Sequence, residues 1–250
     1  MATATPATLL LLHGPGQSPP AWQGVVDHLD PERPMFAPWL KGLKPTARSQ
    51  FDLGEAAADL LNTLELRGVE RADLVGHSLG GMVALRAAAE APGRIVHLVL
   101  VSTPVMPPAD EVRRQRRWLA LLPASQFGDL PKAQVLEALD ALAAADVSTD
   151  LSRIETPTLA VVAAGDQASQ AAAVLLHRQI GAQIRALPGA DPALMTTYPE
   201  ELAALIEDFC ADRPPAVPTV DPAAADPDAS NASNATDPGA ADLEADRPGD

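Results

Sequence analysis

The 250-residue sequence predicts an α/β fold in which a mostly parallel sheet of about six strands is covered by helices. The first observation is that short apolar runs alternate with longer segments of helical periodicity between residues 7 and 210. Such alternation leads to right-handed crossovers and therefore to parallel strands. The second observation is that the short runs are apolar at successive positions, which is typical of strands buried on both faces.

Four elements are expected before the middle of this region: a strand over 7–13, a helix over 18–29, a short strand over 35–38 and a helix over 51–67. The first strand is a continuous apolar run that stops at Gly14. Ser18 and the two prolines after it are suited to the first positions of a helix. The helix over 51–67 has apolar residues at helical spacing, and Gly68 stands where a C-terminal cap belongs.

The next expected elements are a strand over 71–76, a helix over 79–90 and a strand over 95–101. The first two meet at the sequence Gly-His-Ser-Leu-Gly of residues 76–80, which matches the pattern G-x-S-x-G. Flanked by a strand and a helix, this pattern is a nucleophile elbow, in which a sharp turn exposes the serine hydroxyl at the end of the sheet. Glycines at its two ends let the backbones approach closely. We therefore expect Ser78 to be the nucleophile, with the Leu79 N–H as oxyanion donor at the helix N-terminus.

Residues 104 to about 153 interrupt the alternation with prolines and two predicted helices. An insertion at this point is expected to form a cap over the end of the sheet that bears the serine. The first of its helices carries four arginines, Arg113, Arg114, Arg116 and Arg117. These could attract an anionic substrate, or they could form a solvated helix face beside Asp110 and Glu111.

The last part of the domain supplies a strand over 158–163, a helix over 170–180, a strand over 183–187 and a closing helix that runs to Cys210. Thr197 and Glu200 are spaced as a capping box for the closing helix. Cys210 is the only cysteine, which excludes an intramolecular disulfide, and it is expected to be a buried core thiol.

Composition predicts one domain over residues 1–211, with the cap inserted at about 104–153, followed by a tail over 212–250. The tail is rich in proline, alanine and acidic residues and is expected to be disordered. The net charge of −15 argues against nucleic acid and against anionic membranes as partners. The run Leu9–Leu12 is too short for a signal peptide or a membrane span, so a cytoplasmic location is expected.

Over residues 7–210 the chain resembles the α/β-hydrolase family, in its branch of small esterases, lactonases and cofactor-free haloperoxidases. The matching pieces are Leu12-His13-Gly14 with Trp22 after it, the elbow over 75–81, Pro157-Thr158-Leu159 leading to Gly165, Leu187-Pro188-Gly189-Ala190, and Pro199-Glu200-Glu201. The first strand already carries the His-Gly pair that belongs to the family's third strand. The resemblance therefore implies a sheet of about six strands, all parallel. It implies no cofactor and no metal, and a small molecule as substrate or ligand.

The chain departs from the family at three positions near the expected chemistry. The second oxyanion donor of the family follows the His-Gly pair, where this chain has Pro15, which lacks an N–H; the donor is lost or moves to Gly16 or Gln17. The family's acid would fall on Ala168, although Asp166 could turn in to replace it. The family's catalytic histidine would fall on Pro192, so the base is missing.

The other histidines are expected to be structural. His13 belongs to the oxyanion loop, His77 points away from the serine, and the remaining three lie on helices or at the far end of a strand. Asp191 adjoins the vacant position, but a carboxylate is a poor base for a serine hydroxyl at neutral pH.

Two interpretations of function remain open. The first is a weak or atypical serine hydrolase of small esters, thioesters or lactones that uses Ser78, Leu79 and groups recruited from unusual positions, such as Asp166. The second is a relative without a complete triad that binds a small apolar ligand under the cap, as a receptor or as a pocket for chemistry without acyl transfer. The first interpretation explains why the elbow is intact. The second explains why the chain departs from the family at three catalytic positions together. The sequence does not determine the oligomeric state.

Overall fold

The computed structural model of the chain describes residues 6–45, 47, 50–127 and 130–211. The tail over 212–250, expected to be disordered, lies outside the described residues. The sheet has six strands in the order β2-β1-β3-β4-β5-β6, and every neighbouring pair is parallel. The strands are β1 Thr8–Leu12, β2 Met35–Phe36, β3 Ala72–His77, β4 Ile95–Val101, β5 Thr158–Ala163 and β6 Gln183–Leu187. The predicted six-stranded parallel α/β fold is confirmed.

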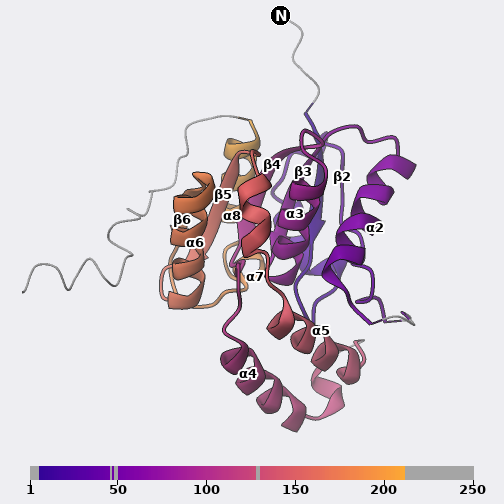
Figure 1. Cartoon of the computed structure of the whole chain (residues 1–250), viewed down its shortest axis with the longest axis vertical. Coiled ribbons are helices and arrows are strands. Elements are labelled where there is room, and N and C mark those ends of the chain that lie inside the picture. The colour runs from indigo at the N-terminus through magenta and orange to yellow at the C-terminus, as the bar shows by residue number, and fades with distance from the viewer. Residues whose placement is uncertain (1–5, 46, 48–49, 128–129, 212–250) are drawn as a thin grey trace, which may run out of the picture.

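Helices cover both faces of this sheet (Figure 1). The α-helices are α1 Gln23–Val26, α2 Leu53–Leu66, α3 Leu79–Glu90, α4 Ala109–Leu121, α5 Lys132–Ala144, α6 Gln167–Ile180, α7 Leu194–Thr197 and α8 Pro199–Cys210. Short 3-10 helices occupy Pro19–Trp22, Ala124–Phe127 and Ser148–Arg153. None of the helices in the described part of the chain combines the length and the apolar character that a membrane span requires.

Two cores form because successive strand residues point to opposite faces of the sheet. Leu10 and Leu12 of β1 pack with α2, α3 and α6, whereas Leu9 and Leu11 pack with α1, α7 and α8. The same alternation holds in β3, β4 and β5. Residues of both faces are therefore buried, which is why the strands are apolar at successive positions.

Most predicted boundaries agree with the structure to within three residues, and two local predictions are wrong. The helix expected over 18–29 is a 3-10 turn followed by α1, which ends at Val26, a few residues before Pro31 disfavours further helix. The capping box at Thr197 is absent, because Thr197 closes α7 and its hydroxyl bonds Asp191 Oδ2 at 3.1 Å. The closing helix α8 begins instead with a proline at its first position.

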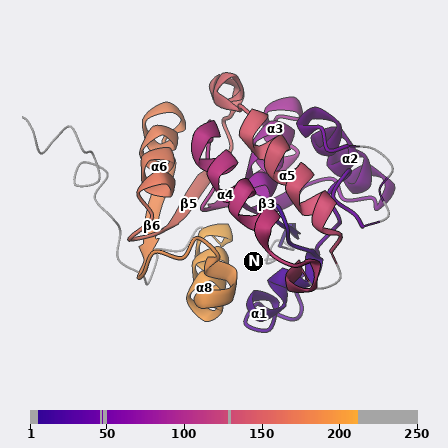
Figure 2. The same cartoon turned by 90° about the horizontal axis from the view of Figure 1, so that it is seen from below.

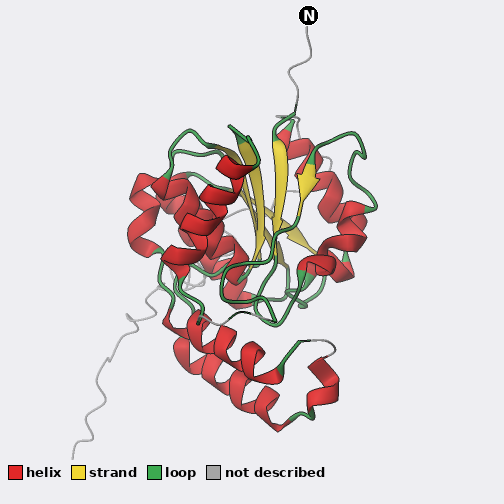
Figure 3. Ribbon diagram, turned by 90° about the vertical axis from the view of Figure 1, so that its right-hand side faces the viewer, coloured by secondary structure: helices red, strands yellow, loops and turns green. Residues whose placement is uncertain are grey.

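The segment between β4 and β5 carries α4 and α5, which pack against each other and lie beyond one end of the sheet (Figures 1 and 3). Viewed from that end, both helices cross in front of β3 (Figure 2). Arg116 of α4 and Asp140 of α5 form an ion pair at 2.5 Å. Parallel strands bring their carboxyl ends to one edge, so this helical pair faces the edge at which β3 ends.

Candidate active site

Ser78 occupies the turn between β3 and α3 with φ 51° and ψ −116°. Its N–H donates to the Val101 carbonyl at 3.0 Å, and its carbonyl accepts from the Gly81 N–H at 3.0 Å. A non-glycine residue with positive φ is held in a sparsely populated conformation by its surroundings. Here the backbone is held from both sides, by the neighbouring strand and by the first turn of the helix.

The turn is possible because Gly80 lies against the end of β1. A Cβ at Gly80 would stand 2.4 Å from the Leu12 carbonyl oxygen and 2.6 Å from that of His13. Backbone atoms cannot move aside as the end of a side chain can. The glycine is therefore required by packing and not only by the turn itself.

We expect Gly80→Ala to lower the free energy of unfolding by about 3 kcal/mol, because the new methyl group overlaps backbone atoms. Gly54→Ala is the matched control: it lies in the first turn of α2, and its nearest atom would be Asp52 Oδ1 at 3.4 Å. That control should be neutral or slightly stabilising. Urea unfolding followed by tryptophan fluorescence measures both. Equal midpoints for Gly80→Ala and wild type would show that the close approach is absent.

Ser78 borders a cavity of about 590 Å³ between the sheet edge and the cap. Prolines and other apolar residues of the segment 104–108, together with the first two turns of α6, make up much of its wall. Val112 and Gln115 of α4 and Leu142 of α5 contribute from the cap. A cavity lined mainly by apolar residues, with a smaller number of polar groups, is typical of small-molecule sites.

Ser102 is a residue of this cavity that the sequence analysis did not single out. It directly follows β4 and has φ 43°, and it is the second non-glycine residue with positive φ in the described part of the chain. Its side chain is buried, and its Oγ has no hydrogen-bond partner among the described residues. No motif marks this serine, because its position is set by where β4 ends beside β3. The cavity is thus bordered by two serines in strained backbone conformations.

Asp166 and Ala168 also border the cavity. The Asp166 carboxylate caps α6: its Oδ1 accepts from the Ser169 N–H at 3.4 Å, and its Oδ2 accepts from the Ser169 hydroxyl. This carboxylate is therefore already engaged at the N-terminus of its own helix. Its role as a catalytic acid stays a prediction.

Pro192 borders the same cavity as Ser78, so the position expected for the family's histidine lies in the cavity wall. The loop around it is held by Asp191, whose Oδ1 accepts from the Ala193 N–H at 2.9 Å. Asp191 Oδ2 is bonded to the Thr197 hydroxyl, as described above. Both oxygens of this carboxylate thus serve the loop.

His77 also borders the cavity, and its ring bonds Gln17 and Pro192; the expectation that it points away from Ser78 stays a prediction. Its Nδ1 lies 2.9 Å from Gln17 Oε1, and the Pro192 carbonyl accepts a hydrogen bond from the imidazole. Burial lowers the pKa of His77 to about 4, against the opposing effects of that carbonyl and of the Asp191 carboxylate. The ring is turned toward the space beside Pro192 because Gly14, which has no side chain, leaves room for it.

The side chains of the other four histidines contact groups other than the Ser78 hydroxyl, or solvent. His13 bonds the Gly14 carbonyl at 3.1 Å, and His97 bonds Asp73 Oδ1 at 2.8 Å. His177 bonds the Ala182 carbonyl at 2.9 Å, and His28 is exposed just beyond α1. No hydrogen bond between an imidazole and Ser78 Oγ is found within the described ranges, which contain all five histidines of the chain.

Leu79 begins α3, so its N–H belongs to the first turn and has no partner within the helix. Pro15 and Gln17 border the cavity, and the Gln17 N–H donates to the Gly14 carbonyl at 3.3 Å. Gly16 has φ 68° and lies against Val135 in a small neighbouring hollow. The roles of Leu79 and Gly16 as oxyanion donors stay predictions.

A group with metal-ligand chemistry, Asp73, His97 and Cys210, lies elsewhere in the described part of the chain. Asp73 and Ser78 are on β3 and just past it, five residues apart, which corresponds to roughly 16 Å along an extended strand. This group is therefore too far away to act on a substrate bound at Ser78.

A sequence model of the alpha/beta hydrolase fold matches residues 7–134. The chain is 35% identical over 95 residues to a pimeloyl-[acyl-carrier protein] methyl ester esterase of Pectobacterium carotovorum, covering 38% of this chain and 36% of the relative. It is 31% identical over 136 residues to a 1-acylglycerol-3-phosphate O-acyltransferase of Rattus norvegicus, covering 50% of this chain and 38% of the relative. The chain thus spans less than two-fifths of the length of these curated relatives.

Among solved structures, a thermophilic esterase from Thermogutta terrifontis is similar, with a TM-score of 0.70 and 23% identity. The match covers 84% of this chain and 91% of that structure, which shows a common fold. The parallel sheet, the strand-turn-helix at Ser78 and the match of the sequence model agree with one another. The chain belongs to the alpha/beta hydrolase family.

Proposed function

We propose that the chain is a weak or atypical serine hydrolase of small esters, thioesters or lactones, with Ser78 as its nucleophile. One observation supports this proposal: Ser78 has a strained, positive-φ backbone at a strand-to-helix turn that borders a cavity of about 590 Å³. Strain of this kind persists only where the surrounding structure maintains it, and it is concentrated at functional sites.

In the proposed reaction, Ser78 Oγ attacks the carbonyl carbon of the bound ester. The carbonyl oxygen gains the negative charge, which the Leu79 N–H and the positive end of α3 stabilise. The alcohol leaves, and water then attacks the acyl-serine to release the acid. Because Pro192 replaces the base, the hydroxyl proton passes to water in the cavity, which makes both steps slow.

His77 does not supply the missing base in this proposal. Its ring contacts Gln17 and the Pro192 carbonyl, and an imidazole with a pKa of about 4 holds a proton weakly. Loss of a triad base lowers turnover by a factor on the order of 10⁴ to 10⁶, whereas the oxyanion hole and substrate binding keep part of the acceleration. This is the physical reason for expecting a weak enzyme.

The cavity wall supports this substrate class. Its prolines, alanines and aliphatic side chains suit an uncharged acyl group, and a smaller number of polar residues line it beside the two serines and on α4 and α6. Relatives of this chain are named as a methyl ester esterase and an acyltransferase, and both names refer to acyl groups. A small neutral ester, thioester or lactone fits this combination.

The second candidate function is binding of a small apolar ligand without hydrolysis. It is favoured by the engaged state of the Asp166 carboxylate and by the proline at position 192. The Ser102 hydroxyl, which has no partner in the described part of the chain, would then bond a polar group of the ligand. Here Ser78 would contribute contact and no chemistry.

Labelling with a fluorophosphonate separates the two candidates. A weak hydrolase should be labelled at Ser78 slowly, over hours, and Ser78→Ala should abolish both labelling and the hydrolysis of an activated ester. Ser102→Ala is the matched control, since this serine borders the same cavity and should leave Ser78 labelling in place. Absence of labelling and of Ser78-dependent hydrolysis in the folded protein, together with saturable binding of an apolar fluorescent probe, would favour the second candidate.

A further inference from the structure

A polar cluster lies at the end of the sheet opposite Ser78. We call Arg33, Asp73, His97, Glu207 and Cys210 the base cluster, because they lie at the bottom end of the sheet; the name does not refer to a catalytic base. Asp73 and His97 are paired in register on the neighbouring strands β3 and β4, so their side chains emerge side by side on one face. The helix α8 covers that face, and its last turn brings Cys210 to the same place.

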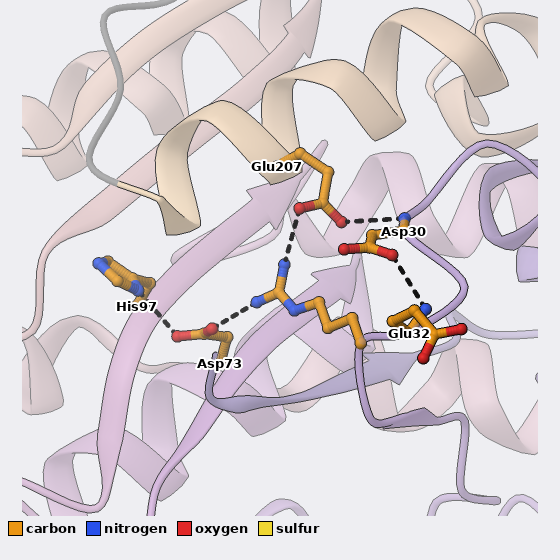
Figure 4. Close-up of polar contacts among 6 residues, drawn as sticks. Asp30, Glu32, Asp73, His97 and Glu207 are labelled. Carbon is orange, nitrogen blue, oxygen red and sulfur yellow. Dashed lines mark hydrogen bonds and ion pairs between the residues drawn. The ribbon is translucent and has the colours of Figure 1, made fainter. Parts of the chain in front are cut away.

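The two oxygens of Asp73 have different partners (Figure 4). Oδ2 forms an ion pair with the Arg33 guanidinium at 2.5 Å, and Arg33 also faces Glu207 Oε2 at 3.5 Å. Oδ1 lies 2.8 Å from His97 Nδ1. The guanidinium therefore holds one side of the carboxylate, and the other side is turned toward the imidazole.

Three different ligand atoms meet beside Asp73, and one of them, the Cys210 sulfur, also bonds the Arg33 guanidinium. Asp73, His97 and Cys210 each offer one, and all three atoms lie within 4.8 Å of one another. In a tetrahedral zinc site, ligands at about 2.1 Å from the ion stand roughly 3.4 Å apart. The imidazole and carboxylate need to separate by about half an ångström, and the sulfur needs to approach by less than about 1.5 Å. We propose that Asp73, His97 and Cys210 bind a Zn²⁺ ion.

The Cys210 sulfur also bonds the Arg33 guanidinium, and burial raises the pKa of its thiol to about 12. Zinc binding would displace the thiol proton. The carboxylates of Asp73 and Glu207 and the bound thiolate would then carry three negative charges, of which the Arg33 guanidinium neutralises one. A zinc ion would balance the remaining two, with Arg33 as an outer partner that orients the Asp73 carboxylate. A mixed set of one sulfur, one nitrogen and one oxygen suits zinc better than magnesium or calcium, which prefer oxygen alone.

The cluster also has space for a fourth ligand. Arg33, Asp73, His97, Glu207 and Cys210 all border a cavity of about 960 Å³. A water molecule in that cavity would complete the tetrahedron. The bound ion would join β3, β4 and the end of α8, which is a stabilising role and independent of the reaction proposed at Ser78.

Cobalt(II) is a direct probe of this site, because a thiolate bound to it produces a charge-transfer band in the near ultraviolet. The chain has one cysteine, so such a band can arise only from Cys210. The full chain, freed of metal by a chelator, should develop the band with one equivalent of Co²⁺ and lose it when Zn²⁺ displaces the cobalt. The melting temperature should rise by about 5–10 °C at a free zinc concentration roughly 100-fold above Kd.

Cys210→Ser should remove the band and weaken zinc binding by about 100-fold or more, which is the size of effect seen when residues at metal sites are replaced. Exposed His28 is the matched control, and His28→Gln should keep the band and the affinity. Absence of the band in folded wild-type protein overturns the proposal without recourse to any variant. An equal zinc-induced rise in melting temperature in wild type and in Cys210→Ser also overturns it, because binding would then occur at other acidic groups and the base cluster would be an ion-pair network alone.

Discussion

Pro192→His is expected to raise the hydrolysis of an activated small ester by about 10²-fold or more over wild type, which is the lower end of what a positioned general base contributes. Pro192 and Ser78 border the same cavity, and the prediction requires that an imidazole at position 192 reach the serine across it. An imidazole with an ordinary pKa of about 6.5 can accept the hydroxyl proton near neutral pH. The change therefore restores the chemistry whose absence defines the proposed weak enzyme.

The loop is held well enough for this test. Asp191 bonds the Ala193 N–H and the Thr197 hydroxyl, and these contacts do not involve the side chain at position 192. The gain remains limited because Pro15 lacks the N–H of a second oxyanion donor, which is worth a factor of ~10² to 10³.

Ala168→Asp combined with Pro192→His should act more strongly than either change alone, because the members of a triad work as a unit. Position 168 borders the cavity and lies two residues from Asp166, whose carboxylate is engaged at the cap of α6. A carboxylate introduced at position 168 is expected to face the cavity and to orient the introduced imidazole.

Pro192→Ala is the matched control, since it removes the proline without adding a base. The increase must vanish when Ser78→Ala is added to the active variant. The account of the site fails if wild type already hydrolyses esters at ordinary rates. It fails equally if the double variant folds, as judged by circular dichroism, and shows no Ser78-dependent gain.

The second large effect is expected in the pH dependence of stability. Burial lowers the pKa of His13 to about 4, although a hydrogen bond to the Gly14 carbonyl opposes the shift. Burial lowers the pKa of His77 to the same value. The geometry at His13 explains the direction: Nδ1 is 3.1 Å from the Gly14 carbonyl oxygen, and Nε2 accepts from the Leu40 N–H at 3.4 Å. A second proton on the His13 ring would sit on Nε2 and point at the Leu40 N–H, so the two donors would repel each other.

Both folded-state pKa values lie below the unfolded value of about 6.5, so between pH 6.5 and 4 the unfolded chain binds protons that the folded protein does not. Stability due to these groups is thus fully present above pH 6.5 and is lost as pH falls to about 4. The loss is on the order of 3 kcal/mol for each histidine. The losses from the two histidines together approach the whole free energy of unfolding of an ordinary domain.

Urea unfolding at a series of pH values measures this loss as a slope. We expect the free energy of unfolding to fall by up to about 2.7 kcal/mol per pH unit within the window, from the two histidines together. His13→Asn should remove about half of that slope, and His28→Gln should leave it unchanged. If His13→Asn is too unstable for the series, the proton NMR signals of the wild-type imidazoles report the same titration. A signal of His13 or His77 that titrates near pH 6.5 would contradict the prediction.

Local sequence patterns predicted most of the fold because the elements depend on nearest neighbours. Apolar runs marked β3, β4 and β5, although Asp73 interrupts the first and His97 the second. The pattern G-x-S-x-G marked the turn at Ser78, where the two glycines and the flanking elements act within a few residues. The two wrong local predictions, the helix over 18–29 and the capping box at Thr197, fall where the same residues fit two local structures. Thr197 could cap a helix or end one, and its bond to Asp191 decided the outcome.

By itself, the sequence determined the parallel α/β architecture, the position of Ser78 at a strand-to-helix turn and the proline at position 192, because periodicity and turn chemistry are written in adjacent residues. Tertiary structure alone decided that His77 borders the cavity, that Ser102 borders it with a hydroxyl that has no partner among the described residues, and that Asp73, His97 and Cys210 meet at the opposite end. These contacts join residues between 24 and 137 positions apart, whose proximity depends on strand register and on the docking of α8. No spacing in a sequence encodes such a meeting, because it exists only once the sheet has formed and the helices have packed on it.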